Sequence, residues 1–221
     1  MREVKKYHTR EVLREHYFLL DEKKHGEYNR WYHTGILCEK SSWENGERHG
    51  EFKRYYVNGN LEEHSFWVNG KRHGDSTMWY INGKLEQQSH HEHGRRHGER
   101  KMWSENGVMT QHSNWKNGVK HGEGKQWFTN GQLQEHSFWK NGYLHGDLIK
   151  IRWGGDLIEK SRWENGKRHG ECIQRDSRGR LQKHHFYSHG VVVTDSVVSM
   201  ITDINDITDE ERTMIKLAFG F

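Results

Sequence analysis

Proline is absent from this sequence of 221 residues, and cysteine occurs only twice. Average usage would place about ten prolines in a chain of this length, so their absence excludes proline-rich linkers, polyproline ligands and collagen. A chain without proline keeps a backbone N–H donor at every position, which suits a continuous β-ladder. Cys38 and Cys172 lie far apart in the sequence. We therefore expect no disulfide framework and a reducing, cytoplasmic compartment.

Apolar residues are also scarce, at 31% of the chain. No stretch approaches the roughly 18 apolar residues that indicate a membrane-spanning helix. The first twenty residues carry charges throughout, so we do not expect a signal peptide there. Leu, Ile, Val and Phe together fall below a fifth of the chain, which borders on a disordered composition. Ten Trp and a net charge of only +4 argue instead for a folded chain.

Basic and acidic residues are interspersed, 35 against 31. No Lys/Arg run marks a nucleic-acid-binding tract, so we expect no nucleic-acid partner. Nineteen histidines make the charge sensitive to acid, and mild acidification should loosen any interface that holds several of them. No P-loop, G-x-S-x-G or H-E-x-x-H motif is present, so we expect no enzymatic activity and no cofactor.

A strict internal period of 24 residues organises most of the chain. His-Gly recurs seven times at this interval without one insertion or deletion, and two further glycine columns keep the same period. An acidic residue follows every His-Gly pair. We interpret the His-Gly pairs as structural repeat residues: His25, Gly26, His49, Gly50, His73, Gly74, His97, Gly98, His121, Gly122, His145, Gly146, His169 and Gly170.

Asn-Gly occurs nine times, at two positions of the repeating unit, and it is the strongest short signal for a β-hairpin because both residues tolerate a positive φ. In the second unit we place one strand near 51–57 and the other near 60–68, joined by a tight Asn-Gly turn. The six residues from Asn69 to Gly74 then form a wider turn, with a bulge or close backbone approach at the glycine of His-Gly. Seven units predict fourteen strands in an elongated, all-β, single-layer antiparallel hairpin solenoid.

An even period keeps each column of residues on one face of the sheet. Leu61, Ser65 and Trp67 share a face that is nearly uniform between units, and we interpret it as a ladder of stacked Trp and Leu. The other face varies between units and should be wetter. Its phenylalanines are candidates for binding a partner protein: Phe66, Phe138 and Phe186.

The segments WVNGKRHGDSTMWYINGKLEQQS (67–89) and WKNGVKHGEGKQWFTNGQLQEHSFWKNGYLHGD (115–147) resemble MORN repeats, in particular their N-G-K-x-H-G-E variant. The resemblance covers about residues 13–190. It implies an elongated single-layer sheet of hairpins that serves as a protein-interaction scaffold or contacts phospholipid. The repeats also resemble short bacterial proteins that carry an antitoxin label and free-standing arrays of large DNA viruses, which would suit a minor capsid or virion component.

The repeat divides the chain into three segments. Residues 1–12 should form an opening strand or N-terminal cap, and 13–190 the seven units. Residues 191–221 should form a C-terminal cap or a docking tail, with a short helix near 209–219 that starts from a Thr-x-x-Glu capping signal. Whether the tail covers the last strand edge or docks on another subunit stays open. Its candidate partner-binding residues are Met214, Ile215, Leu217 and Phe219.

Two sets of residues that recur with the 24-residue period resemble ion-binding sites: the His-Gly histidines and the acids that follow them. Histidines of neighbouring His-Gly pairs should lie about 9.6 Å apart, too far to share one zinc ion at about 2.0–2.3 Å from each ligand. The acids after His-Gly should pair across strands with bases such as Arg48 and Arg72 on a solvated surface. The best local metal candidate is a group of four nearby histidines: His90, His91, His93 and His97. No Cys or dedicated carboxylate completes this group, and we expect no physiological metal site there.

The sequence therefore predicts a non-enzymatic scaffold that binds proteins within a larger assembly, in the cytoplasm or a virion. Self-association through an edge or a face is also open. A single-partner binding module, such as an antitoxin, is the alternative. A third hypothesis is a phospholipid-surface tether that uses the basic turns at 71–72 and 95–96.

Overall fold

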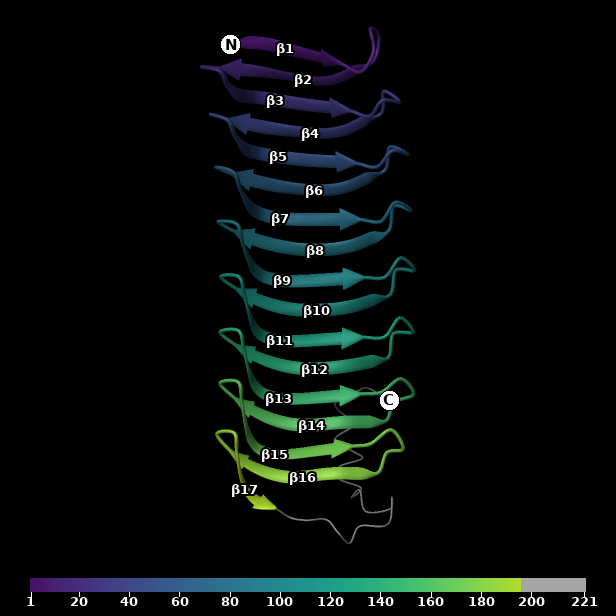
Figure 1. The fold of residues 1–221 in the computed structure, drawn as a ribbon, viewed down its shortest axis with the longest axis vertical. Helices are drawn as coiled ribbons and strands as arrows, with labels where there is room; N and C mark the ends of the chain where they lie inside the picture. Colours follow the sequence, from purple (N-terminus) through teal and green to yellow (C-terminus); the bar gives the residue numbers. More distant parts are fainter. Residues whose placement is uncertain (196–221) are drawn as a thin grey trace.

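The structure is a computed structural model that describes residues 1–195. One antiparallel sheet of 17 strands runs through these residues, and each strand pairs with the next along the chain (Figure 1). The sheet does not close on itself. The prediction of an all-β, single-layer hairpin solenoid is confirmed. The helix predicted near 209–219 lies outside the described residues, as do Met214, Ile215, Leu217 and Phe219.

The strands are β1 (Arg2–Tyr7), β2 (Leu13–Leu20), β3 (Lys23–Trp31), β4 (Leu37–Glu44), β5 (Glu47–Tyr55), β6 (Leu61–Val68), β7 (Lys71–Trp79), β8 (Leu85–Glu92), β9 (Arg95–Trp103), β10 (Met109–Lys116), β11 (Val119–Trp127), β12 (Leu133–Lys140), β13 (Tyr143–Ile151), β14 (Leu157–Glu164), β15 (Lys167–Arg175), β16 (Leu181–Ser188) and β17 (Val191–Asp195). The predicted number of fourteen strands was wrong. The ladder includes β1 and β2 before the first His-Gly, and β17 continues it after the last turn.

The tight turns are the Asn-Gly pairs that follow the returning strands. In the second unit, Val68 of β6 pairs with Lys71 of β7 across a two-residue turn. Asn69 and Gly70 adopt φ values of 48° and 70°, which is the conformation that makes Asn-Gly favourable in two-residue hairpins.

A β-bulge follows each of these turns. Ser65 faces Ser76, yet Trp67 faces Arg72, so β7 holds two more residues than β6 between the same two pairings. Gly74 lies in the bulge with φ 87°, a value that an L side chain rarely adopts. The predicted six-residue turn was therefore wrong, because two of its residues form the turn and the remainder belong to β7. The suggestion of a bulge at the glycine agrees with the structure.

The second Asn-Gly of the unit lies in a wider loop over residues 56–60. The N–H of Tyr56 donates to the carbonyl of Asn60 (2.8 Å), and the N–H of Asn60 donates to Oδ1 of Asn58 (3.0 Å). This is an Asx turn, in which an asparagine side chain replaces a backbone acceptor. The Tyr56 hydroxyl also donates to the carbonyl of Trp79 in the next unit (2.8 Å). The tight turn predicted here was wrong, and the strand expected over 51–57 ends at Tyr55.

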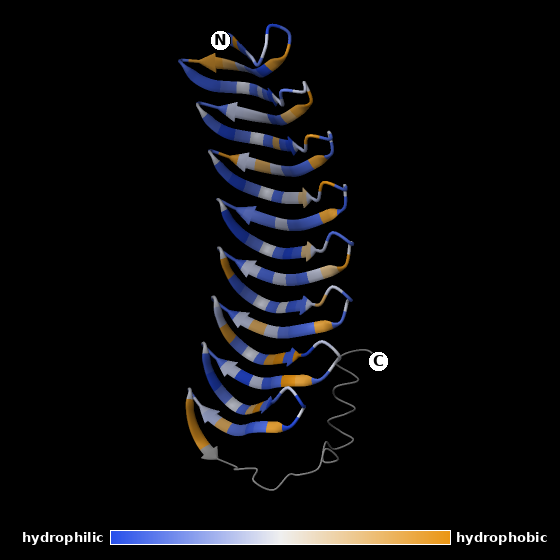
Figure 2. Ribbon diagram, turned by 45° about the vertical axis from the view of Figure 1, so that its right-hand side comes forward, coloured by the Kyte–Doolittle hydropathy of each residue, from blue (hydrophilic) through white to orange (hydrophobic). Residues whose placement is uncertain are grey.

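The two faces of the sheet differ in exposure, as the repeat pattern predicts. Ser65 and Glu63 are 0% and 1% exposed on one face, whereas Phe66 on the other face is 42% exposed. Figure 2 shows that hydrophilic residues dominate the strands and that hydrophobic residues occupy short segments of them. None of the described residues forms a helix long and apolar enough to span a membrane. Much of the buried surface is therefore polar, and its hydrogen bonds must be satisfied within the sheet.

Candidate functional site

A relay of polar groups crosses the more buried face, here called the Trp–Ser–Glu face after Trp67, Ser65 and Glu63. These residues alternate along β6, so their side chains lie on one side of the sheet. Nε1 of Trp67 donates to Oγ of Ser65 (3.0 Å), and that hydroxyl donates to Oε1 of Glu63 (3.0 Å). Arg72 contacts the same oxygen at 2.5 Å, and Arg54 contacts Oε2 at 3.2 Å. The buried carboxylate is thus held by two guanidinium groups and a hydroxyl, which offset the cost of removing it from water.

The relay repeats with the sequence period. Ser41 and Ser161 accept from Trp43 and Trp163, each at 2.9 Å. They donate in turn to Glu39 at 3.1 Å and to Glu159 at 3.0 Å. Arg48 and Arg168 complete the two copies at 3.1 and 3.2 Å from the carboxylates. The glutamates of the relay were not predicted from the sequence, although their positions keep the 24-residue period and the parity of Ser and Trp: Glu39, Glu63, Gln87, Gln111, Glu135 and Glu159.

The tryptophans do not stack directly on one another, contrary to the predicted Trp and Leu ladder. The guanidinium of Arg48 lies between two of them, 5.5 Å from the ring of Trp43 and 5.3 Å from that of Trp67. Phe52 also packs against Trp67, with ring centroids 6.1 Å apart. Equivalent tryptophans are separated by an intervening strand, so bases and aromatic rings from that strand fill the space. Cation–π contacts replace aromatic stacking as the repeated interaction.

The middle of the array departs from this pattern. Gln87 and Gln111 replace the carboxylate, and Arg100 donates to Oε1 of Gln87 at 2.9 and 2.7 Å and to Oε1 of Gln111 at 2.5 Å. His91 replaces the tryptophan, and the hydroxyl of Ser89 beside it is buried without a hydrogen-bond partner. Burial first, and then the nearby Arg72 and Arg96, lower the pKa of His91 to about 4. This part of the face is therefore short of negative charge.

The opposite face, here called the His–Phe face after His64 and Phe66, carries ion pairs on a solvated surface. Glu51 lies 2.9 Å from Nε2 of His64 and 2.7 Å from Nζ of Lys53. The pKa of Glu51 is lowered chiefly by its hydrogen bond with Lys53. Burial acts in the opposite direction, and His64 lowers the pKa further. Equivalent pairs join His16 to Glu3, His90 to Asp75, His136 to Glu123 and His184 to Glu171.

The acids after His-Gly therefore have partners that the sequence analysis did not assign. Arg48 and Arg72, predicted as those partners, lie on the Trp–Ser–Glu face and bind the buried glutamates. The prediction placed Arg72 in a six-residue turn. In the structure Arg72 and Asp75 lie three residues apart in β7, so their side chains point to opposite faces. The surface is solvated, as expected, and His and Lys supply the positive groups.

The predicted partner-binding phenylalanines are exposed on the His–Phe face. Phe66, Phe138 and Phe186 each lie against a histidine two residues earlier, with ring centroids 5.0, 4.9 and 5.4 Å apart. Three repeats separate Phe66 from Phe138, which is about 29 Å at about 4.8 Å per strand. The phenylalanines therefore form separate apolar points on a polar surface.

Family comparisons agree with this repeating geometry. The MORN repeat family matches residues 112–133 and 161–179, and the MORN repeat variant family matches 48–69, 72–93 and 96–117. The chain is a MORN repeat protein. A comparison with curated proteins finds no match. MORN repeat arrays are typically non-catalytic and generally serve as scaffolds that bind proteins or membranes.

The His-Gly histidines of the MORN units lie beneath the tight turn of the following unit. Nδ1 of His145 accepts the backbone N–H of Asn165 at 3.3 Å, and Nδ1 of His121 accepts that of Asn141 at 3.4 Å. Nδ1 of His49 lies 3.3 Å from the side-chain oxygen of Asn69. Each histidine therefore links one hairpin to the next, a role consistent with its interpretation as a structural repeat residue.

The four histidines of the predicted metal candidate are not brought together. His90 lies on the His–Phe face beside Asp75, whereas His91 is buried on the other face. His93 occupies a tight turn and packs on His73 of the preceding unit, and His97 faces Glu92. Local sequence proximity was a poor guide, because neighbouring residues of a strand point to opposite faces.

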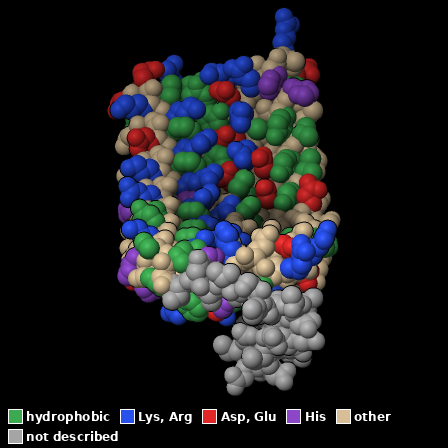
Figure 3. Space-filling model, turned by 60° about the horizontal axis from the view of Figure 1, so that its bottom comes forward, with side chains coloured by type: hydrophobic (Ala, Val, Ile, Leu, Met, Phe, Trp, Pro, Cys, Tyr) green, Lys and Arg blue, Asp and Glu red, His purple; other side chains and the backbone are tan. Residues whose placement is uncertain are grey.

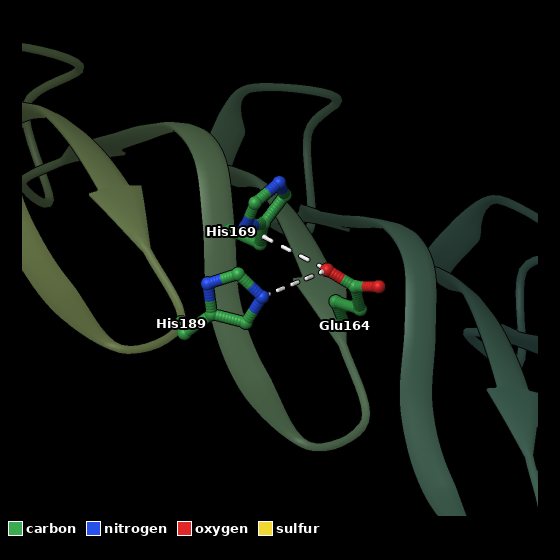
Figure 4. Close-up of side chains that lie close together, drawn as sticks. All are labelled: Glu164, His169 and His189. Atoms are coloured by element: carbon green, nitrogen blue, oxygen red, sulfur yellow. Dashed lines mark ion pairs between the residues drawn. The ribbon is translucent and has the colours of Figure 1, made fainter.

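A different histidine cluster forms between units. Glu164, His169 and His189 each direct one ligand atom to a common region, and these atoms lie within 4.8 Å of one another (Figure 4). The cluster was not predicted from the sequence because His189 is 20 residues from His169. The available signal was that His189 stands in a column where five other units have asparagine.

Proposed function

We propose that this MORN array is a non-enzymatic scaffold that binds other proteins within a larger assembly through its His–Phe face. The supporting observation is the exposure of three phenylalanines on that face: 42% for Phe66, 36% for Phe138 and 38% for Phe186. Burying the exposed part of one such ring contributes about 1 kcal/mol. Three of them provide a modest, distributed affinity that suits repeated contacts within an assembly.

The spacing of these rings favours an extended partner or several partners in succession. Phe66 and Phe186 are five repeats apart, which corresponds to about 48 Å at about 4.8 Å per strand. A small domain measures about 30 Å across, so one compact partner does not contact all three rings. This spacing supports a larger assembly over the antitoxin-like alternative, in which one partner binds one array.

The Trp–Ser–Glu face is less suited to binding another protein. Its buried glutamates, serines and arginines already satisfy one another in the relay. A partner that inserted polar groups there would have to replace these hydrogen bonds without leaving buried charges unpaired. Figure 3 shows one face of the sheet, with columns of hydrophobic, basic and acidic side chains that run along the molecule.

The phospholipid-tether alternative has less support, for an electrostatic reason. Arg72 and Arg168, from the basic pairs at 71–72 and 167–168, contact buried carboxylates. Their charge is largely compensated within the sheet, which weakens the attraction of these turns for an anionic surface. A membrane role would have to rely on the remaining lysines and arginines.

The location of the assembly is part of the proposal. Cys38 and Cys172 are buried and free, and burial is the main cause that raises the pKa of the Cys172 thiol. Inert, reduced cysteines fit a cytoplasmic, reducing compartment. A minor capsid role in a virion is a finer form of the same proposal and rests on the resemblance of the repeats to viral arrays.

The test compares two triple variants of the full chain, expressed with a tag in the native source and purified after cross-linking. One carries Phe66→Ser, Phe138→Ser and Phe186→Ser on the His–Phe face. The matched control replaces three exposed apolar residues of the wide loops, Val57→Ser, Ile81→Ser and Trp153→Ser, which are 49%, 50% and 56% exposed.

We expect the face variant to lose its stoichiometric cross-linked partners and the loop variant to keep them, as quantified by mass spectrometry. Loss in the loop variant alone would contradict the proposed face. A single partner that tolerates any two of the three Phe changes would favour the antitoxin-like alternative. Salt-sensitive flotation of the wild-type chain with anionic vesicles would favour the membrane tether.

A further inference from the structure

The cluster of Glu164, His169 and His189 joins three elements at one end of the array. Glu164 ends β14, His169 lies in β15, and His189 is the first residue of the turn between β16 and β17. Oε2 of Glu164 lies 3.7 Å from Nδ1 of His169 and 3.5 Å from Nε2 of His189. Figure 4 shows both imidazole rings directed toward this one carboxylate oxygen.

These separations approach those of ligands that share a zinc ion. Zinc binds imidazole nitrogen and carboxylate oxygen at about 2.0–2.2 Å in a tetrahedral arrangement, which places two ligand atoms of the same ion about 3.4 Å apart. Two of the three separations are within a few tenths of an ångström of that value. The third pair, the two histidine nitrogens, lies within 4.8 Å, and rotation of the solvent-exposed His189 ring can shorten it.

The turn itself does not require a histidine. His189 adopts φ 50°, and asparagine serves the same left-handed position in five other turns: Asn45, Asn69, Asn117, Asn141 and Asn165. In addition, Nδ1 of His169 is a buried atom without a hydrogen-bond partner. A polar atom of this kind needs an explanation, and a metal ion supplies the missing interaction.

The other units contain parts of the same arrangement. Glu92 and His97 are 3.2 Å apart, but Asn117 stands where His189 stands. His73 and His93 pack with ring centroids 5.3 Å apart, but Val68 stands at the position of Glu164. Within residues 1–195, Glu164, His169 and His189 are the one group that offers three such ligands together.

We propose that Glu164, His169 and His189 form a zinc-binding site that fastens the last hairpins of the array together. Two imidazoles and one carboxylate form a donor set suited to zinc, while magnesium and calcium prefer oxygen ligands alone. Glu164 and His169 also line a hollow of about 310 Å³, together with His145, Arg162 and Trp163, and water in this hollow can complete the coordination. The ion would tie the β14–β15 hairpin to the turn before β17, an edge strand that pairs with β16.

The first experiment titrates the chelator-treated full chain with zinc in a calorimeter and with cobalt by visible absorption. We compare the wild type with His189→Asn, which restores the asparagine of the other turns. The control is His93→Asn, which makes the same change in a turn where Val68 stands at the position of Glu164. We expect one zinc per chain and a loss of affinity of at least about tenfold in His189→Asn only. Equal loss in both variants, or several weak equivalents unaffected by either, would show adventitious uptake by surface histidines and overturn the proposal.

A second experiment introduces the same three ligands at another turn of the array, so that the proposal can be tested even if His189→Asn alters the fold. Asn117→His should join Glu92 and His97 and add a second zinc per chain. Zinc should also raise the melting temperature of the wild type, because ligands that bind the folded state stabilise it, and should not raise that of His189→Asn. No second zinc in Asn117→His together with unchanged zinc affinity in His189→Asn would refute the geometric argument.

Discussion

The region around β6 and β7 and the region around β8 and β9 share the same turn, bulge and strand register. They satisfy their buried polar groups differently. In the first region, the carboxylate of Glu63 accepts hydrogen bonds from Ser65 and Arg72 and forms an ion pair with Arg54. In the second region Gln87 stands at the position of Glu63, and its side-chain oxygen accepts two hydrogen bonds from Arg100. One backbone therefore accommodates both a charged and a neutral network, and the comparison indicates that turn chemistry, more than the composition of the face, specifies the fold.

The largest expected effect comes from removing the carboxylate of the first region. Glu63→Ala leaves Arg54 and Arg72 without their shared partner, and such losses from buried pairs cost about 3–5 kcal/mol. Gln87→Ala should cost only about 1–3 kcal/mol, because it removes a neutral hydrogen-bond acceptor. Urea unfolding followed by tryptophan fluorescence measures both values. Glu51→Ala, on the solvated face, is the control and should cost about 1 kcal/mol or less. Equal costs for Glu63→Ala and Gln87→Ala would contradict the contrast between the regions.

The second effect is a pH dependence confined to the middle of the array. His91 has a pKa lowered to about 4, whereas an unfolded histidine titrates near about 6.5. The unfolded chain therefore binds the proton first as pH falls, so stability is complete above about pH 6.5 and declines toward about pH 4. We expect amide exchange in β8 and β9 to accelerate across this window more than in β6 and β7. Uniform acceleration along the array would count against a role for His91.

A third, smaller effect should follow from restoring the tryptophan of the other units. His91→Trp places an indole N–H beside Ser89, whose buried hydroxyl lacks a partner. Satisfying that group should add about 1–2 kcal/mol to the free energy of unfolding. The variant should also lose the pH dependence between about 6.5 and 4, since the titrating group is gone. Unchanged stability in urea unfolding at pH 7.5 would show that Ser89 is already satisfied, for example by water.

The smallest effect should come from making the second region resemble the first. Gln87→Glu places a carboxylate against Arg100, whose pKa is lowered chiefly by burial and then by Arg96. We expect a gain of about 1 kcal/mol, because a hydrogen bond between charged groups is stronger than its neutral counterpart. The added charge should also raise the pKa of His91, which a histidine NMR titration can follow. Lower stability in Gln87→Glu would mean that desolvation of the new carboxylate outweighs its pairing.

Sequence patterns predicted the fold because the periodic residues are those that fix the backbone. The period of His-Gly and Asn-Gly indicated the hairpin unit and the single-layer sheet. They did not indicate which Asn-Gly makes the tight turn, since Asn69-Gly70 and Asn58-Gly59 are the same dipeptide. In the wide loops the asparagine side chain accepts the backbone N–H two residues later, from Asn60, Lys84 or Gln132, and this bond is visible only in the structure.

Side-chain networks were harder to predict than the backbone. Because residues 69–74 were expected to form a turn, alternation was not applied to them, yet Arg72 lies in β7 and points away from Asp75. The role of Glu63 was not predicted because the equivalent position holds Glu in some units and Gln in others. A search for identical residues at the 24-residue period therefore passes over it. The cluster around His189 depends on contact between successive units, which appears only when the register is known.

Because each strand pairs only with its neighbours in sequence, the array behaves as a ruler. Adding or removing one 24-residue unit changes its length by about 9.6 Å, two strand spacings, and leaves the packing of the other units in place. The reach of the His–Phe face can therefore be adjusted in fixed steps, which lets a sheet of this kind measure a distance between the components that it connects.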